Sequence, residues 1–183
     1  MEKKWTTVDV LRQSRHDWLN KIQIIKGNLE LNKLDRVKGI IDEIIMEAQQ
    51  EARLSNLEMP RFVELLLTAN WQQSSFQCDY EVVDMIEGSK ELDEMIASWT
   101  SGYFNILAEQ LDCHIENVLT ISIFKNEGNG RWDFHLQGKL KDKDQVIRFL
   151  KQSSREQRAI RQLECGPDEL SFQMDINLET IKR

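Results

Sequence analysis

His16 is the residue whose type and position best suit chemistry in this sequence. Residues 5–31 have helical periodicity, and their apolar side chains fall on one stripe, formed by Leu11, Trp18, Ile22, Ile25 and Leu29. At about 100° per residue, His16 lies about 150° from this stripe, on the side of the helix that faces water. A neutral imidazole is nucleophilic, and its bond to phosphorus keeps a high transfer potential. An imidazole at this position suits phosphoryl transfer, but by position alone a single exposed histidine on a helix is more often an ordinary solvated side chain.

Polar residues flank His16 on the same side of this helix. We expect a partner protein to contact the strip that they form, which consists of Arg12, Gln13, Arg15, Gln23 and Gly27 together with Asn20. The glycine allows close approach of another backbone. We interpret Asp17 as orienting the imidazole or balancing local charge, and Asn20 as hydrogen-bonding the phosphoryl group or the partner. Both are equally compatible with ordinary exposed helix positions.

A second helix must support the first. Residues 32–34 form a short connection, Asp35 is a candidate N-cap, and a broad apolar face continues to about Leu54, formed by Val37, Ile40, Ile41, Ile44, Ile45 and Ala48. So short a connection predicts an antiparallel hairpin. Its apolar surface is too wide for one hairpin to bury, which favours pairing with a second copy into a four-helix bundle. The alternative is that the C-terminal half of the same chain covers it.

The segment 55–60 interrupts this pattern and divides the chain into a helical hairpin domain, 1–57, and a C-terminal domain, 58–183. The C-terminal domain alternates between helical and strand patterns. We predict helices at 61–70, 91–111 and 144–152, strands at 80–83, 118–124, 131–137 and 170–178, and a turn at 126–130. The fold class is therefore α+β, with a mixed sheet covered by one helical layer.

Composition limits the function classes. The 183 residues carry a formal charge of −7, but residues 1–40 carry nine Lys/Arg against five Asp/Glu, which suits an acidic partner surface better than nucleic acid. No apolar run reaches the roughly 18 residues of a membrane span, and we expect a cytoplasmic protein. The three cysteines predict reduced, mostly buried thiols. Cys113 and His114 are adjacent and lack a second ligand pair, so the spacing does not support zinc.

Residues 14–29, from Ser14-Arg15-His16-Asp17-Trp18-Leu19-Asn20 to Gly27-Asn28-Leu29, closely resemble the helical segment of the sporulation initiation phosphotransferase B family. The resemblance continues through Asp35-Arg36-Val37 and 54–57, and it is weaker at 80–82 and 119–122. The box from His16 to Asn20 is also similar to the phosphoacceptor box of citrate-type sensor histidine kinases.

This resemblance implies a phosphorelay intermediate. His16 would accept a phosphoryl group from the aspartyl phosphate of a single-domain response regulator and pass it to the aspartate of a DNA-binding sporulation regulator. It also implies a homodimer joined through the hairpins and a C-terminal domain similar to a degenerate histidine kinase ATP domain. This chain would bind no cofactor or metal, because the receiver domain would supply the Mg²⁺ in its carboxylate pocket.

Two alternatives remain open. An autophosphorylating kinase would need paired asparagines on a helix and a glycine-rich nucleotide loop. The candidate helix has Asn105 but Ser101 four residues earlier, and the glycines at 128 and 130 fit a hairpin turn. The second alternative is a non-catalytic dimeric adaptor that binds a receiver domain.

Overall fold

The computed structural model describes residues 5–126, 128–154 and 158–181. Contacts divide the chain into two compact units, residues 1–49 and 50–183. Lys3 and Lys4 of the basic segment, and Glu127 of the turn at 126–130, lie outside the described residues. Among the residues described, no helix combines the length and apolar character that a membrane span requires.

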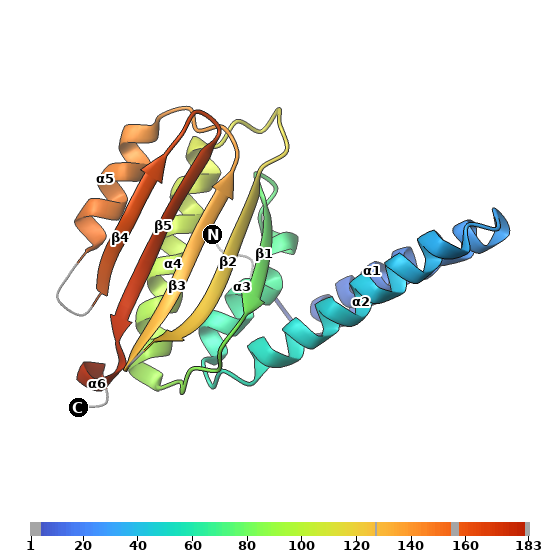
Figure 1. Cartoon of the computed structure of the whole chain (residues 1–183), viewed down its shortest axis with the longest axis horizontal. Coiled ribbons are helices and arrows are strands. Elements are labelled where there is room, and N and C mark those ends of the chain that lie inside the picture. The colour runs from blue at the N-terminus through green and yellow to red at the C-terminus, as the bar shows by residue number, and fades with distance from the viewer. Residues whose placement is uncertain (1–4, 127, 155–157, 182–183) are drawn as a thin grey trace. The chain divides into compact units, whose positions relative to one another are not determined.

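The first unit is a helical hairpin. Helix α1 (Thr7–Glu30) begins with a capping box, in which the Thr6 hydroxyl accepts from Asp9 N at 3.2 Å and Thr6 N donates to the Asp9 carboxylate. It ends in a Schellman motif: Asn32 has φ +50°, and Lys33 N donates to Asn28 O at 2.9 Å. Helix α2 (Leu34–Ser55) follows at once, and the two helices lie alongside each other (Figure 1).

The hairpin confirms the predicted connection and corrects one detail. Asp35 lies inside the first turn of α2, and is not its N-cap, because the helix begins one residue earlier. Lys33 O, which accepts from Val37 N at 3.1 Å, marks the start of the helix instead. An ion pair between Lys21 and Glu47 joins α1 to α2, as expected for antiparallel helices.

The second unit contains one five-stranded sheet with the strand order β1-β2-β3-β5-β4. Its strands are β1 (Gln77–Val82), β2 (Val118–Asn126), β3 (Asn129–Gln137), β4 (Arg158–Cys165) and β5 (Glu169–Asn177). β1 pairs with β2 in parallel, and the other three pairs are antiparallel. The sheet is therefore mixed, as predicted.

Helices form one layer on this sheet. They are α3 (Pro60–Gln72), α4 (Lys90–Gln110) and α5 (Lys143–Ser153), and a short α6 (Leu178–Ile181) follows β5. Figure 1 shows α4 and α5 crossing a single face of the sheet. Trp99 and Tyr103 of α4 pack edge-on against Phe134, which stacks on its cross-strand neighbour Phe172 with ring centroids 4.8 Å apart. This aromatic cluster joins the helical layer to the sheet.

The last turns of α2 belong to the second unit. Leu54 is fully buried there, and the backbone of Val82, at the end of β1, is held from α2 on both sides. Val82 N donates to the Gln50 side-chain oxygen at 2.8 Å, and Arg53 donates to Val82 O at 3.0 Å. The helix that begins in the hairpin therefore ends as part of the core of the C-terminal unit.

The strand β4 was not predicted. It is an edge strand whose register shifts between Arg161 and Glu164, and Gln162 there has φ +48°. This bulge removes the strict alternation of buried and exposed residues that identifies β2, β3 and β5 in the sequence.

Candidate functional site

His16 lies in the middle of α1, and 66% of its side chain is exposed. The capping box at Thr6 and the Schellman motif at the other end fix a helix that carries this residue more than two turns from either terminus. Helical periodicity predicts an exposed position, and the structure agrees. An exposed imidazole on a regular helix can be approached by a second protein without rearrangement of the backbone.

One nitrogen of the imidazole ring is engaged, and the other is free. Nδ1 of His16 lies 3.4 Å from Oδ1 of Asp17 and 3.3 Å from Nδ2 of Asn20. Among the described residues, none is hydrogen-bonded to Nε2. A carboxylate can only accept, so the contact with Asp17 favours the tautomer that carries its proton on Nδ1, with the Asn20 amide turned so that its oxygen faces the ring. That tautomer leaves the lone pair of Nε2 available for nucleophilic attack.

Asp17 is itself held by a neighbour on the same helix. Nε2 of Gln13 donates to Oδ1 of Asp17 at 3.4 Å, across one helical turn. Gln13 is half-buried, and the side chain of Asp17 is 42% exposed. We predicted Gln13 as part of the exposed strip; the structure places it at the margin of the strip, where it binds Asp17. The 13–17 spacing of four residues was the sequence signal for this contact.

The two arginines near His16 differ in whether a carboxylate pairs with them. Arg12 lies 3.5 Å from the Asp9 carboxylate, yet 72% of its side chain is exposed. Arg15 is exposed, and no ion pair holds it among the residues that the structure describes. Both guanidinium groups are therefore exposed to solvent close to His16 on α1.

Further along α1, Gln23 is exposed and Gly27 is half-buried. A Cβ atom built at Gly27 would meet no heavy atom within 4 Å, leaving aside its neighbours in the helix. The structure of the chain itself therefore imposes no steric need for glycine here.

The apolar stripe of α1 is mostly exposed in the single chain. Leu11, Trp18, Ile22 and Leu29 are 60%, 50%, 54% and 47% exposed, and only Ile25 of the stripe is half-buried. Residues about a quarter of a turn away, such as Asp17 and Lys21, are the more covered ones. Trp18 is therefore not a core residue of the single chain.

Residues considered for nucleotide binding have other environments. Asn105 is exposed on α4, with Ser101 one turn earlier. Gly128, at φ +81°, forms the turn between β2 and β3, and its carbonyl accepts from Leu178 N at 3.1 Å. The glycines of this segment thus serve the hairpin, as predicted. His135 lies on the face of β3 opposite Trp132, Phe134 and Leu136.

The cysteines are less buried than the sequence suggested. Cys78 is buried, and burial raises the pKa of its thiol to about 12. Cys113 and Cys165 are exposed, contrary to the expectation of mostly buried thiols. Cys113 follows the end of α4 and Cys165 ends the edge strand β4, so neither position is covered by the helical layer.

Both halves of the chain match known protein families. Residues 58–177 match the family described as sporulation initiation phospho-transferase B, C-terminal. Residues 1–57 match the description Sensor_kinase_SpoOB-type, alpha-helical domain. The chain is 38% identical over 116 residues to sporulation initiation phosphotransferase B of Bacillus subtilis strain 168, a match that spans 63% of this chain and 60% of that protein.

Solved structures show the fold. The histidine kinase domain of the blue-light activated histidine kinase EL346 from Erythrobacter litoralis has a TM-score of 0.50 and 14% identity, covering 66% of this chain and 59% of that chain. A longer structure of the same kinase covers 100% of this chain and 63% of that chain, with a TM-score of 0.49 and 14% identity. The predicted similarity of the C-terminal domain to a histidine kinase ATP domain is confirmed at the level of the fold by the first of these structures. With both halves matched, the chain belongs to the sporulation initiation phosphotransferase B family.

Proposed function

We propose that this protein is a cytoplasmic phosphorelay phosphotransferase that carries the phosphoryl group on His16. The donor is the aspartyl phosphate of a single-domain response regulator, and the acceptor is the aspartate of a DNA-binding sporulation regulator. The observation that carries this proposal is the geometry of His16, whose Nδ1 contacts Asp17 while 66% of the side chain is exposed. Family membership supports the same reaction class.

The chemistry of the first transfer follows from this tautomer. The lone pair of His16 Nε2 attacks phosphorus, the N–P bond forms, and the P–O bond to the donor aspartate breaks with its electron pair leaving on the carboxylate. The imidazole ring then carries positive charge and keeps its proton on Nδ1. Asp17, at 3.4 Å from Nδ1, balances that charge. In the second transfer an acceptor carboxylate attacks phosphorus and the N–P electron pair returns to the ring.

The charge of the transferring group must be stabilised by groups outside His16. Asp17 is the one carboxylate that contacts His16 among the described residues, and Mg²⁺ binding in proteins uses several oxygen ligands. We propose that the receiver domain holds the Mg²⁺ and that this chain supplies no metal to the transfer. Arg12 and Arg15 would meet the acidic surface around that metal site.

We further propose that two hairpins pair into a four-helix bundle. No residue of α1 is buried in the described chain, and α2 leaves Ile41 and Ile45 exposed by 42% and 49%. Apolar surface of this extent on a soluble helix pair indicates a protein interface. Sedimentation equilibrium should give a dimer for the wild type and a monomer for Ile22→Glu, with Gln23→Glu as the neighbouring control. A dimeric Ile22→Glu would contradict this interface.

The transfer itself is tested with a response regulator that carries radiolabelled phosphate, with labelled ATP as a parallel donor. We expect label from the regulator, none from ATP, and none in His16→Ala, while His135→Ala behaves as the wild type. The label should be acid-labile and alkali-stable. Labelling from ATP alone would identify a kinase, and regulator binding without any label would identify an adaptor.

A further inference from the structure

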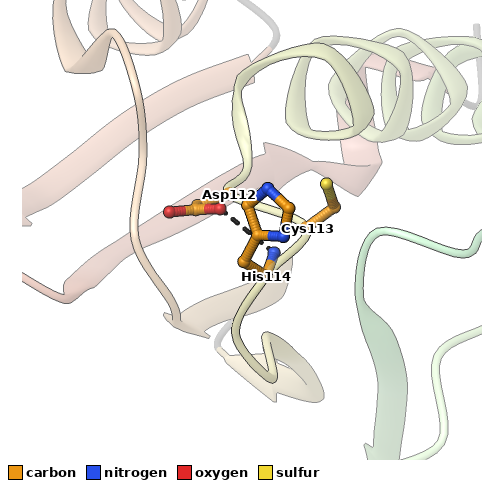
Figure 2. Close-up of side chains that lie close together, drawn as sticks. All are labelled: Asp112, Cys113 and His114. Atoms are coloured by element: carbon orange, nitrogen blue, oxygen red, sulfur yellow. Dashed lines mark hydrogen bonds between the residues drawn. The ribbon is translucent and has the colours of Figure 1, made fainter.

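The turn that follows α4 brings three different metal-binding groups together. Asp112, Cys113 and His114 each offer one ligand atom, a carboxylate oxygen, a thiol sulfur and a ring nitrogen, and these atoms all lie within 4.8 Å of one another. Figure 2 shows the imidazole of His114 between the other two side chains. The spacing of Cys113 and His114 in the sequence does not indicate this site, because the third ligand, Asp112, is not part of a recognised zinc-ligand spacing.

We propose that Asp112, Cys113 and His114 bind a zinc ion. Thiolate sulfur and imidazole nitrogen are donors that Zn²⁺ prefers, and a carboxylate oxygen is a common third ligand. Mg²⁺ and Ca²⁺ select sites built from oxygen alone, so this donor set does not suit them. Three protein ligands also leave one tetrahedral position for water or for an exogenous ligand.

Small rotations of exposed side chains complete the geometry. With metal–ligand distances of about 2.0–2.3 Å, tetrahedral ligand atoms lie about 3.3–3.5 Å apart. Cys113 and His114 are exposed, so both side chains can turn by the ångström or so that this requires. Oδ1 of Asp112 accepts from the backbone N–H of His114 at 3.0 Å (Figure 2), while Oδ2 has no hydrogen-bond partner among the described residues.

The backbone of this turn is fixed from outside the cluster. Asp112 N donates to Lys139 O at 2.9 Å, and Asp112 O accepts from Nδ2 of Asn117 at 3.0 Å. Asn117 is 2% exposed, and its amide also donates to Ser75 O at 2.9 Å and accepts from Lys139 N at 3.2 Å. A fixed backbone limits the ordering cost of metal binding to the rotations of the three side chains.

The proposal is tested on the full chain with Zn²⁺, in competition with a chromophoric chelator, and with Co²⁺ as a spectroscopic probe. We expect one Zn²⁺ per chain and a thiolate-to-cobalt charge-transfer band. Cys113→Ser should abolish the band and weaken Zn²⁺ binding by about 100-fold, and His114→Ala should weaken it by at least about tenfold. Cys165→Ser removes the other exposed thiol, and His16→Ala removes the other exposed histidine. Neither residue belongs to the cluster, so both variants should bind Zn²⁺ as the wild type does.

Folding is checked separately by thermal unfolding without metal, where Cys113→Ser and His114→Ala should match the wild type because both side chains are exposed. Asp112→Asn keeps the hydrogen bond to His114 N but weakens the oxygen ligand, and we expect a smaller loss of affinity. Absence of saturable Zn²⁺ binding, or a cobalt band that survives Cys113→Ser, would overturn the proposal. Phosphoryl transfer by His16 does not depend on the outcome.

Discussion

The side-chain nitrogen of Asn20 lies 3.3 Å from Nδ1 of His16, one helical turn away on α1. Asp17 contacts the same ring nitrogen from the adjacent position. An amide can present either its oxygen or its nitrogen to the ring, so Asn20 can serve both protonation states of Nδ1. Two residues thus hold the imidazole while its other nitrogen stays free.

Replacing Asn20 by alanine should slow phosphoryl transfer and leave folding intact. Loss of one hydrogen bond of about 1 kcal/mol corresponds to about a fivefold lower rate. Single-turnover transfer from a labelled regulator measures this effect. Asn28→Ala is the matched control, because Asn28 on the same helix donates to Ile24 O at 2.8 Å. Equal rates of phosphoryl transfer in Asn20→Ala and Asn28→Ala would show that Asn20 does not contribute to the transfer.

Gly27→Gln should block the approach of the regulator without altering the nucleophile. A Cβ at Gly27 meets no atom within 4 Å, and a glutamine favours the helix by up to about 1 kcal/mol. We therefore expect an unchanged or higher melting temperature together with weaker regulator binding in a titration. Gly39→Gln on α2 is the control, since its Cβ is equally unobstructed. Normal transfer by Gly27→Gln would contradict our interpretation of this helix face.

Asp93 should contribute strongly to the stability of the C-terminal unit. It is 3% exposed, and its carboxylate accepts from Arg61 N at 3.0 Å and from Phe62 N at 2.8 Å. The start of α3 has no side-chain cap of its own, so Asp93 provides the cap from α4. We expect Asp93→Ala to lower the free energy of unfolding by about 1–3 kcal/mol in urea titrations.

The neighbouring exposed acid provides the comparison for this cap. Glu94 pairs with the Arg61 side chain at 3.9 Å, and both side chains are more than half exposed. Surface pairs of this kind contribute at most about 1 kcal/mol. A larger loss in Glu94→Ala than in Asp93→Ala would show that the backbone cap is not the source of the stability.

Asp133 should destabilise the folded state at neutral pH. Burial raises the pKa of its carboxyl, and the nearby Arg131 only partly opposes this effect. The folded protein therefore holds this proton more tightly than the unfolded chain, so stability is lost as the pH rises through the raised pKa. Asp133→Asn should have a higher melting temperature than the wild type at neutral pH, and the difference should shrink on acidification.

Asp175, in contrast to Asp133, should stabilise the folded state at neutral pH. Its carboxylate pairs with Arg131 at 2.8 Å and with Arg161 at 3.3 Å, so its charge is compensated in the fold. Asp175→Asn should lower the melting temperature at neutral pH. If both variants shifted the melting temperature in the same direction, the desolvation of Asp133 would not explain the result.

The sequence determined the elements whose signals are local. Helical periodicity placed His16 on the exposed side of α1, and the alternation of buried residues identified β2, β3 and β5. The turn at Gly128 and the short connection after α1 were equally local, because left-handed backbone is favoured by glycine and asparagine. These signals depend on neighbours within a few positions along the chain.

Only the tertiary structure decided the relationships between distant segments. The pairing of Gln50 and Arg53 with Val82, the cap that Asp93 supplies to α3, and the irregular edge strand β4 leave no periodic trace in the sequence. The exposure of Trp18 in the single chain is of the same kind. Each depends on which surfaces meet in space, and that is set by the packing of the whole chain and not by the preference of any one segment.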